Sequence, residues 1–445
     1  MGAVGDEAHL LDQEQFATGR LTASTESSAK YGSMPMKSVP CRVCGSLISK
    51  PFLDHGNQPD SNNFCATAEE AHKAPTTSLQ YGFCDQCCLV QMLGDVPPER
   101  LFTEDYAYVT GTSEPMRDYY AQMAQYLRQR LPYMKKVIEC GPNDGTLLQH
   151  FKDLDHLGIE PSANVAQMAR EKGLAIEESF WGLKTACRLS AEGVTAARGC
   201  ELFLAAHCLT HMPDLNDVLA GIDVVLAPDG VAVFEDPSLD VVIRTTAYDQ
   251  LYSEHFYCLS LPAIQKLVAG HGFQIIEALP VPTHGGSMRV TIARIGSNNA
   301  PEQTLALRMQ AERYLTHPFT CSVFAHNVDT QIAHFAALVR SLKQRGQRIA
   351  ILGASSKVVL ALVRAGIGAE TVDYASDTTP GKIGRFLPVS GIPVISREDA
   401  ESRLPDVFIN GARVHEDFIL RNERRFLEGG GRLLSYIPKV KLIGA

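Results

Sequence analysis

Short apolar runs alternate with amphipathic stretches along the chain from about residue 115 onwards. Apolar runs of roughly four to eight residues between turn residues are typical of buried strands, whereas apolar positions three and four apart predict helices. The pattern predicts a helix over 116–131, a helix start over 147–152, and strands over 136–140, 157–160, 202–206 and 230–235. This alternation predicts an α/β unit with a mostly parallel sheet that helices cover on both faces.

A second alternating block follows a helical stretch over about 301–344, with strands expected over 348–353, 372–376 and 407–410. We interpret it as a second doubly wound unit, with the helical stretch as a connector. The segment over 38–110 is different: it holds paired cysteines and short predicted strands over 81–84 and 88–92. Residues 1–36 are polar without sustained periodicity, so we expect a disordered tail there.

Four cysteines form two C-x-x-C pairs, Cys41 with Cys44 and Cys84 with Cys87. This spacing predicts a four-thiolate zinc site, in which each pair lies on a tight turn and the sulfurs converge tetrahedrally. Such a zinc ion would be structural, because four thiolates leave no open coordination position. We expect the other cysteines to be mostly packing residues.

The strand over 136–140 runs into a turn with the sequence Gly-Pro-Asn-Asp-Gly. Ligands of parallel sheets bind at the carboxyl ends of strands, and an acid about twenty residues further on usually holds ribose hydroxyls. The turn lacks the three glycines of a nicotinamide site, whereas its polar and acidic groups suit S-adenosylmethionine. The predicted residues of this cofactor site are Glu139, Gly141, Asn143, Asp144, Gly145 and Glu160. A strand–turn–helix connection without a ligand is the alternative.

Two further runs are candidates for chemistry. Ser355, Ser356 and Lys357 follow Gly353 at a predicted strand end, where a helix N-terminus could hold a phosphate, unless the turn is a simple connection. The run over 252–255 places a tyrosine, an acid and a histidine together, which suits proton abstraction, although an ordinary helix face is the alternative. His211 follows a predicted strand end and so is expected near the donor.

Composition narrows the class of protein. The chain has 445 residues, which favours two or three domains, and 45% of them are hydrophobic, as in ordinary globular proteins. A net charge of −9 argues against general nucleic-acid binding. No membrane span or secretory signal is evident, so we expect a cytoplasmic protein without a membrane partner.

Taken together, these runs resemble the sugar nucleotide C-methyltransferases of deoxysugar biosynthesis, over about residues 38–442. The resemblance rests on the cysteine pairs, the Glu-x-Gly-x-Asn-Asp-Gly turn and Gly-Ile-Glu-Pro-Ser over 158–162. It also rests on His-x-Pro-Asp-Leu over 211–215, Tyr-x-Glu-His over 252–255 and Gly-Gly-Ser-Met-Arg over 285–289.

The resemblance implies a zinc module over 37–112, a Rossmann-like S-adenosylmethionine methyltransferase domain over 113–300, and connector helices with a C-terminal Rossmann-like nucleotide or substrate domain over 301–445. His255 is then the favoured base that forms an enolate beside a ketone. The other catalytic residues that the resemblance implies are Tyr252, Glu254, His211 and Tyr106. The implied substrate-binding residues are Tyr108, which is the alternative match for the family tyrosine, and Gly286, Ser287, Arg289, Ser355, Ser356 and Lys357.

The chain also departs from the family pattern. His207 stands where an amide is expected, Pro142 where a serine is common, and Asn410-Gly-Ala-Arg413 where a Trp-Asn-Phe-like run is usual. After the acid of the strand that ends at Glu235, the chain continues with Asp-Pro where the family tends to an apolar residue. These departures bear on the identity of the acceptor more than on binding of the methyl donor.

The leading hypothesis is a C-methyltransferase, monomeric or homodimeric, that uses S-adenosylmethionine and structural zinc. It would act at carbon 3 of a small molecule, a dTDP-linked 4-keto-6-deoxy sugar. One alternative is a methyltransferase of the same fold with an unrelated natural-product acceptor. The other is a non-catalytic zinc-ribbon scaffold that binds a nucleotide.

Overall fold

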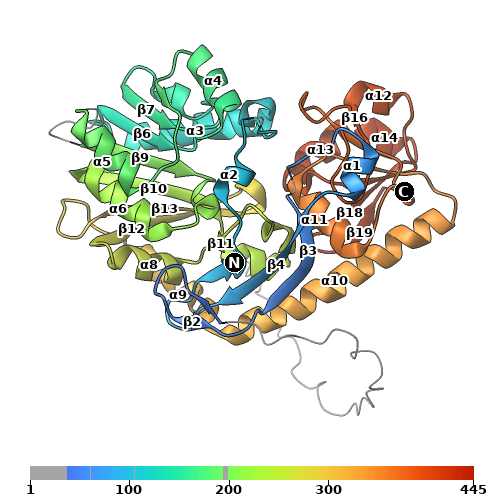
Figure 1. Ribbon diagram of the computed structural model, residues 1–445, viewed down its shortest axis with the longest axis horizontal. Coiled ribbons are helices and arrows are strands. Elements are labelled where there is room, and N and C mark those ends of the chain that lie inside the picture. The colour runs from blue at the N-terminus through green and yellow to red at the C-terminus, as the bar shows by residue number, and fades with distance from the viewer. Residues whose placement is uncertain (1–37, 61, 105, 194–198, 445) are drawn as a thin grey trace, which may run out of the picture. The chain divides into compact units, whose positions relative to one another are not determined.

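The structure is a computed structural model that describes residues 38–60, 62–104, 106–193 and 199–444 (Figure 1). The predicted tail over 1–36 lies outside the described residues. Two α/β units and a small N-terminal module make up the described part of the chain, as the sequence pattern predicts. None of the described helices combines the length and the apolar character that a membrane span needs.

The N-terminal module consists of a short two-stranded ribbon and three strands of a four-stranded antiparallel sheet in the order β11-β5-β4-β3. Strand β11 begins two residues after His255, among elements of the first α/β unit. The sheet therefore joins the module to the segment that carries the predicted base. The elements are β1 (Val39–Pro40), β2 (Leu47–Ile48), β3 (Leu53–Pro59), α1 (Ala68–His72), β4 (Thr76–Phe83), β5 (Val90–Met92), α2 (Pro98–Leu101), η1 (Thr110–Thr112) and β11 (Tyr257–Cys258).

The first α/β unit has a seven-stranded sheet in the order β12-β13-β10-β9-β6-β7-β8. Strands β10, β9, β6, β7 and β8 are parallel. Strand β13 runs antiparallel to both of its neighbours, β10 and β12, so the edge strand β12 has the same direction as the parallel strands. The strands are β6 (Lys136–Cys140), β7 (Asp155–Ile159), β8 (Ile176–Glu177), β9 (Cys200–Ala206), β10 (Leu226–Pro237), β12 (Phe273–Val281) and β13 (Ser287–Arg294). The helices are α3 (Glu114–Arg130), η2 (Leu148–Phe151), α4 (Ala163–Glu171), α5 (Leu183–Ala191), η3 (Leu209–His211), α6 (Leu215–Val225), α7 (Leu239–Thr245), η4 (Tyr248–Gln250), α8 (Leu261–Ala269) and η5 (Thr283–Gly285).

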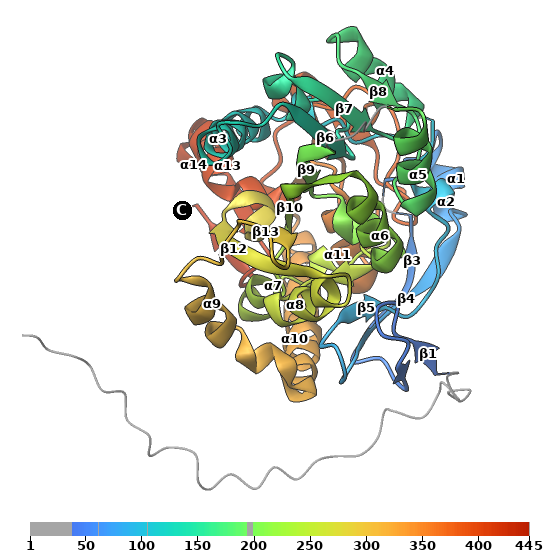
Figure 2. The same cartoon turned by 90° about the vertical axis from the view of Figure 1, so that its left-hand side faces the viewer.

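Helices cover both faces of this sheet because successive strand residues point to opposite sides. Val137 and Leu204 belong to the apolar cluster beneath α3, whereas their neighbours Ile138 and Phe203 pack with residues of α5 and α6. Figure 2 shows α3 and the pair α5–α6 on opposite sides of the strands. Both faces of the sheet are buried, so the strands form nearly continuous apolar runs in the sequence.

The second α/β unit has a six-stranded sheet in the order β16-β15-β14-β17-β18-β19, parallel except for β19. Helix α10, orange in Figures 1 and 2, contacts α11 of this unit, α7 of the first unit and β3 of the module. The elements are α9 (Leu305–Ala311), η6 (Arg313–Thr316), α10 (Pro318–Gln344), β14 (Ile349–Leu352), α11 (Ser356–Ala365), β15 (Ala375–Asp377), β16 (Val394–Ser396), α12 (Arg397–Glu401), β17 (Val407–Asn410), η7 (Arg413–His415), α13 (Glu416–Asn422), α14 (Arg424–Glu428), β18 (Arg432–Ser435) and β19 (Lys441–Ile443).

The structure differs from the predicted elements at three places. The segment over 147–152 forms only the 3₁₀ turn η2, because β7 begins at Asp155 and leaves no room for a longer helix. The helical stretch over 301–344 breaks before Pro318, which starts α10 because proline disrupts a helix interior but is tolerated in its first turn. Strand β15 begins three residues later than predicted.

Candidate active site

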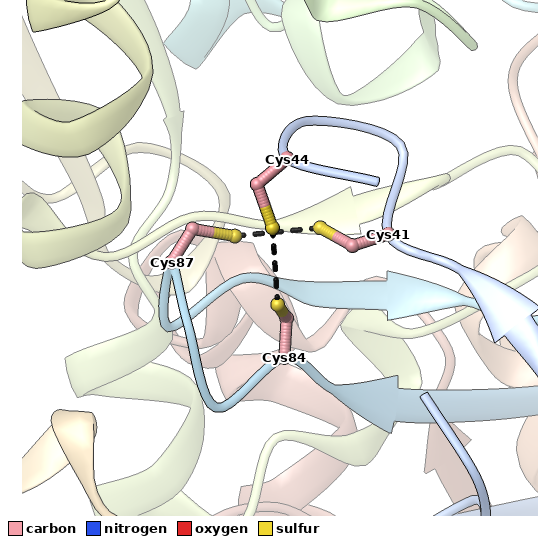
Figure 3. A group of neighbouring side chains, drawn as sticks. All are labelled: Cys41, Cys44, Cys84 and Cys87. Atoms are coloured by element: carbon pink, nitrogen blue, oxygen red, sulfur yellow. Dashed lines mark hydrogen bonds between the residues drawn. The ribbon is translucent and has the colours of Figure 1, made fainter. Parts of the chain in front are cut away.

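The four paired cysteines converge on one point in the N-terminal module (Figure 3). Their ligand sulfurs all lie within 4.8 Å of one another, with Cys41 3.3 Å from Cys87 and Cys44 3.5 Å from Cys84. Thiolates about 2.3 Å from a tetrahedral zinc ion would lie roughly 3.8 Å apart, so this set fits the metal. The predicted zinc site therefore has the geometry that its ligands require.

Removing one sulfur should empty this metal site. In Cys87→Ser we expect zinc content to fall from about one ion per chain to near zero and the melting temperature to fall by about 5 °C or more. Mass spectrometry of metals and thermal unfolding measure both effects. The exposed Cys187 lies outside the pairs, so Cys187→Ser is the control and should keep its metal. Full zinc content in Cys87→Ser would contradict the assignment.

The turn after β6 has the backbone shape of a ligand-binding loop. Gly141 has φ +67°, and a Cβ there would come 2.9 Å from the Cβ of Cys208, so only glycine fits this close crossing of β6 and β9. Asn143 also has a positive φ, 53°. Its side chain accepts a hydrogen bond from the Thr110 amide (2.9 Å) and donates to the Tyr108 carbonyl (3.1 Å). Asn143 thus ties the turn to the loop over 108–110.

Two buried carboxyl groups stand at this turn. Burial, followed by the charges of Glu160 and Asp144, raises the pKa of Glu139 to about 8. Burial raises the pKa of Glu160 to about 7, although amides of Ser162 and Asn143 donate to its oxygens at 3.0 and 2.9 Å. Glu139 Oε2 has no hydrogen-bond partner among the described residues. A ligand with cationic and hydroxyl groups would satisfy both side chains, so the site fits S-adenosylmethionine.

Two of the predicted cofactor residues do not face the cavity. Asp144 is buried, accepts from Thr146 Oγ1 (2.6 Å) and pairs with Lys172 Nζ at 2.8 Å. Gly145 packs against α4, where an added Cβ would meet Leu174 at 2.2 Å. Neither lines the cavity, so both support the turn rather than face a ligand.

A single cavity of about 1020 Å³ is lined by residues of the module and of both α/β units. Its lining includes the β6 turn and Glu160, the start of α11, and several histidines and tyrosines. Among the predicted residues, it is lined by Glu139, Gly141, Asn143, Glu160, Tyr106, Tyr108, His211, Tyr252, His255, Ser355, Ser356 and Lys357.

His255 and His211 both line this cavity and form a ring pair, with centroids 4.8 Å apart. His255 Nδ1 lies 2.6 Å from the Gln250 carbonyl and His211 Nδ1 lies 2.8 Å from the Glu254 carbonyl. A carbonyl can only accept, so each Nδ1 carries the hydrogen and each Nε2 keeps its lone pair. Burial lowers the pKa of His211 to about 4, and burial, His211 and Lys357 hold the pKa of His255 well below its ordinary value. Both rings are therefore neutral near pH 7.

The N-terminal module fixes the backbone around this pair. The hydroxyl of Tyr81, on β4, donates to the His255 carbonyl (2.6 Å) and lies 3.0 Å from the Tyr252 carbonyl. Pairing of β11 with β5 holds the residues that follow. The module also holds the cysteine site, so zinc bound there would stabilise the strands that position the predicted base.

The Glu254 carboxylate does not contact His255. It accepts from Asn62 Nδ2 (2.6 Å) and from the Tyr106 hydroxyl (3.2 Å), while burial raises its pKa to about 7. The neighbouring carboxylate therefore holds Tyr106, and backbone carbonyls orient the imidazoles instead. The Tyr252 ring lies 4.2 Å from the His255 ring and 5.3 Å from Lys357 Nζ.

The turn at the start of α11 meets the first unit at Tyr252. Ser355 caps α11: its Oγ accepts from the Val358 amide (3.3 Å) and donates to the Gly411 carbonyl (2.5 Å). Burial lowers the pKa of Lys357 to about 8, against the charges of Asp249 and Glu254. An anionic group of a ligand would favour the charged form of this lysine.

Three predicted substrate residues lie away from the cavity. Arg289 Nε donates to Glu235 Oε2 at 2.8 Å, and both side chains are buried, so this guanidinium is a structural partner. Ser287 Oγ donates to the Thr283 carbonyl (3.0 Å). Gly286 has φ +122° and touches Val241. Their run shapes the hairpin between β12 and β13, which brings the neighbouring His284 to the cavity.

The structure also adds residues that sequence reasoning did not assign. His284 lines the cavity, and the signal for it was its place directly before the glycine pair. Asp249, in η4, pairs with Arg413 of the second unit, with Arg413 Nε 2.5 Å from Asp249 Oδ2. Gln250 bonds both His255 and the His284 carbonyl. No spacing pattern reveals such partners, because they meet only through the fold.

Comparison with known proteins agrees with this arrangement. Three family models match: a "Putative zinc binding domain" over 41–102, a "Methyltransferase domain" over 112–278 and a "C-methyltransferase C-terminal domain" over 282–438. The C-methyltransferase NovU of Streptomyces niveus is 28% identical over 412 residues, which are 91% of this chain and 97% of NovU.

Similar solved structures overlap with part of the chain. The PH0226 protein of Pyrococcus horikoshii has a TM-score of 0.35 and 16% identity, and covers 45% of this chain and 100% of its own. Magnesium protoporphyrin IX methyltransferase of Synechocystis has a TM-score of 0.29 and 15% identity, over 40% of this chain and 79% of its own. Likeness at this level says nothing about acceptors.

The chain is an S-adenosylmethionine-dependent methyltransferase. Along the chain, the region that matches the zinc-binding model precedes the one that matches the methyltransferase model, and the region that matches the C-methyltransferase C-terminal model follows it.

Donor binding should depend on pH through the two carboxyl groups at the turn. The donor carries cationic groups, which favour carboxylates, and at low pH Glu139 and Glu160 must release protons to ionise. We therefore expect donor affinity to rise about tenfold from about pH 6 to about pH 8, with proton release near pH 7. Calorimetry in two buffers of different ionisation enthalpy measures both. Glu139→Gln should flatten the dependence, and a pH-independent affinity of the unaltered protein would contradict this account.

Proposed function

We propose that this protein methylates the carbon beside the ketone of a nucleotide-linked 4-keto-6-deoxy sugar. The observation that supports this best is the His255–His211 pair, two neutral imidazoles whose Nε2 lone pairs are not held by a backbone partner, inside a cavity shared with the β6 turn. A neutral imidazole is the side chain suited to take a proton from carbon near neutral pH.

The proposed reaction begins with proton transfer. A ketone acidifies the hydrogen on the next carbon; His255 Nε2 takes that proton, and the electron pair of the broken C–H bond moves onto the carbonyl oxygen. The Tyr106 hydroxyl, which lines the same cavity and otherwise donates to Glu254, is suited to donate a hydrogen bond to the resulting enolate oxygen, whereas the Nδ1 hydrogen of His211 is held by the Glu254 carbonyl. When bound, S-adenosylmethionine supplies an electrophilic methyl group for the carbon of the enolate. The proton on His255 then returns to solvent.

The second α/β unit is proposed to hold the nucleotide. Ser356 and Lys357 open α11, a helix of ten residues whose N-terminal amide groups and positive dipole end favour anions. Lys357 also lies over the ring of Tyr252, next to the proposed base. A diphosphate placed here would leave a sugar within the middle of the cavity. The sequence resemblance supports a dTDP-linked substrate.

An unrelated acceptor is the second candidate, and one observation favours it. Asn410 ends β17 in the run that departs from the family pattern, and its side-chain nitrogen and oxygen are both buried without a hydrogen-bond partner among the described residues. The next residue, Gly411, lines the cavity, so the departure from the family pattern lies directly beside the space for an acceptor.

Binding of dTDP separates these candidates. Calorimetry should show that dTDP binds and that Lys357→Met weakens it about tenfold or more, because a buried cation then no longer meets the phosphates. The control is Lys343→Met, which removes a lysine of α10 that pairs with Asp373. This variant should bind dTDP normally. Absence of dTDP binding to the unaltered protein would reject the nucleotide sugar and favour the unrelated acceptor.

A further inference from the structure

His207 and His284 form a second imidazole pair on the wall of the cavity, separate from His255 and His211. Their ring centroids are 4.1 Å apart at an angle of 61°. His207 stands at the carboxyl end of β9, beside the donor turn, and His284 on the hairpin between β12 and β13. Both line the cavity, although neither is in the proposed proton transfer described above.

A buried carboxylate orients this pair. His207 Nε2 lies 3.0 Å from Glu235 Oε1, and Glu235 also accepts from Tyr119 (2.6 Å), Thr283 (2.9 Å) and Arg289 (2.8 Å). Burial alone would raise the pKa of Glu235, but the hydrogen bond and charge of His207, together with Arg289 and Tyr119, lower it to about 2. Glu235 is therefore an acceptor, so His207 Nε2 donates to it, and the His207 Nδ1 has no hydrogen-bond partner among the described residues.

The backbone is unusual at both histidines. His207 has φ 57° and His284 φ 51°, in the left-handed region that side chains other than glycine and asparagine seldom adopt. Such positions cost roughly 1–3 kcal/mol each and cluster at functional sites. Here both strained positions carry rings that meet at one cavity wall.

Gln250 connects this pair with the proposed base. Its carbonyl accepts from His255 Nδ1 (2.6 Å), and its side-chain amide donates to the His284 carbonyl (2.5 Å). One residue thus fixes the positions of His255 and His284. Burial and the charge of His207 hold the pKa of His284 well below its ordinary value, so its ring is neutral and still carries one N–H donor.

We propose that His284 is a further catalytic group, a neutral imidazole that donates a hydrogen bond to the acceptor oxygen on which negative charge develops. His207 and Glu235 are the positioning residues that hold its ring against the cavity. This inference rests on the proposed function, because it concerns the ketone oxygen of the same acceptor.

His284 exchanges no proton during the proposed reaction. When the C–H bond breaks, the proton goes to His255 and the electron pair reaches the ketone oxygen, which accepts the hydrogen bond from His284 more strongly than before. No proton leaves His284. When the electron pair returns to form the carbon–carbon bond, the ketone is restored and that hydrogen bond weakens again.

Asparagine variants test the proposal, because asparagine tolerates the left-handed backbone at both positions. We expect His284→Asn to lower kcat by about 10²–10³-fold, with the KM for the sugar nucleotide and the donor Kd within about threefold. Deuterium uptake beside the ketone, measured with S-adenosylhomocysteine present, should fall equally. His207→Asn should lower kcat by about tenfold, and the double variant should resemble His284→Asn alone, because the two act as one unit.

The exposed His326 on α10 provides the matched control, since His326→Asn should not change kcat. Near-normal kcat in His284→Asn, while the unaltered enzyme methylates the sugar nucleotide, would overturn this proposal and leave the proposed function standing. Parallel losses of donor binding and thermal stability would also overturn it, because they indicate a structural role. If the unaltered enzyme neither methylates the sugar nucleotide nor exchanges its hydrogen, the proposed function fails and this inference fails with it.

Discussion

His255→Ala is expected to slow methyl transfer by about 10²–10⁴-fold, the range that a positioned general base supplies. The loss should appear in kcat and in deuterium exchange beside the ketone, because both need the same proton transfer. Donor affinity should remain nearly unchanged, since the predicted donor site is the turn at Glu139 with Glu160, and His255 belongs to another segment of the cavity wall. Steady-state kinetics, proton exchange by NMR and calorimetry measure these three quantities.

The control for this experiment is again His326→Asn on the exposed face of α10, which should retain normal turnover. Tyr81→Phe is informative as well, because the Tyr81 hydroxyl donates to the His255 carbonyl. Loss of this hydrogen bond should lower kcat although the imidazole is still present. Normal turnover in His255→Ala would remove this histidine from the role of base.

Arg413→Met is expected to destabilise the protein by about 3–5 kcal/mol, because it leaves Asp249 buried without its cation. The Arg413 and Asp249 side chains are 7% and 0% exposed, and the Tyr436 hydroxyl donates to the same carboxylate at 3.1 Å. The pair joins the second α/β unit to the segment directly before Gln250. The variant should therefore also lower kcat, because Gln250 orients His255 and His284.

A matched surface pair provides the comparison. Arg348 and Asp406 are 61% and 42% exposed, so Arg348→Met should cost only about 1 kcal/mol or less. Urea unfolding measures both variants. Replacing both partners, as Arg413→Met with Asp249→Leu, should be less destabilising than Arg413→Met alone. Equal losses of unfolding free energy in Arg413→Met and Arg348→Met would contradict a stabilising role for the buried Arg413–Asp249 pair.

Local patterns predicted much of this molecule. Strands β6, β9 and β14 are apolar on both faces, and such runs can be recognised without knowledge of their neighbours. The cysteine spacing predicted the metal site because each pair is a local turn. The turn at Gly141 was also evident, because a positive φ and a close backbone crossing require glycine there.

Partners across the fold could not be predicted in the same way. The resemblance implied that Arg289 binds substrate, but β13 places it beside Glu235 on the neighbouring strand β10, and the two side chains form a buried ion pair. Glu254 is one residue from His255, yet its side chain turns to Asn62 and Tyr106 of the N-terminal module. The groups that orient His255 and His211 are backbone carbonyls, which no residue pattern reveals.

Incubation of the pure protein with S-adenosylmethionine and dTDP-4-keto-6-deoxyhexoses in heavy water tests the central claim most directly. Mass spectrometry would follow the methyl group and deuterium on the sugar. The account predicts transfer of one methyl group to the carbon beside the ketone. A sugar that gains neither methyl nor deuterium, while the donor still binds, would contradict it.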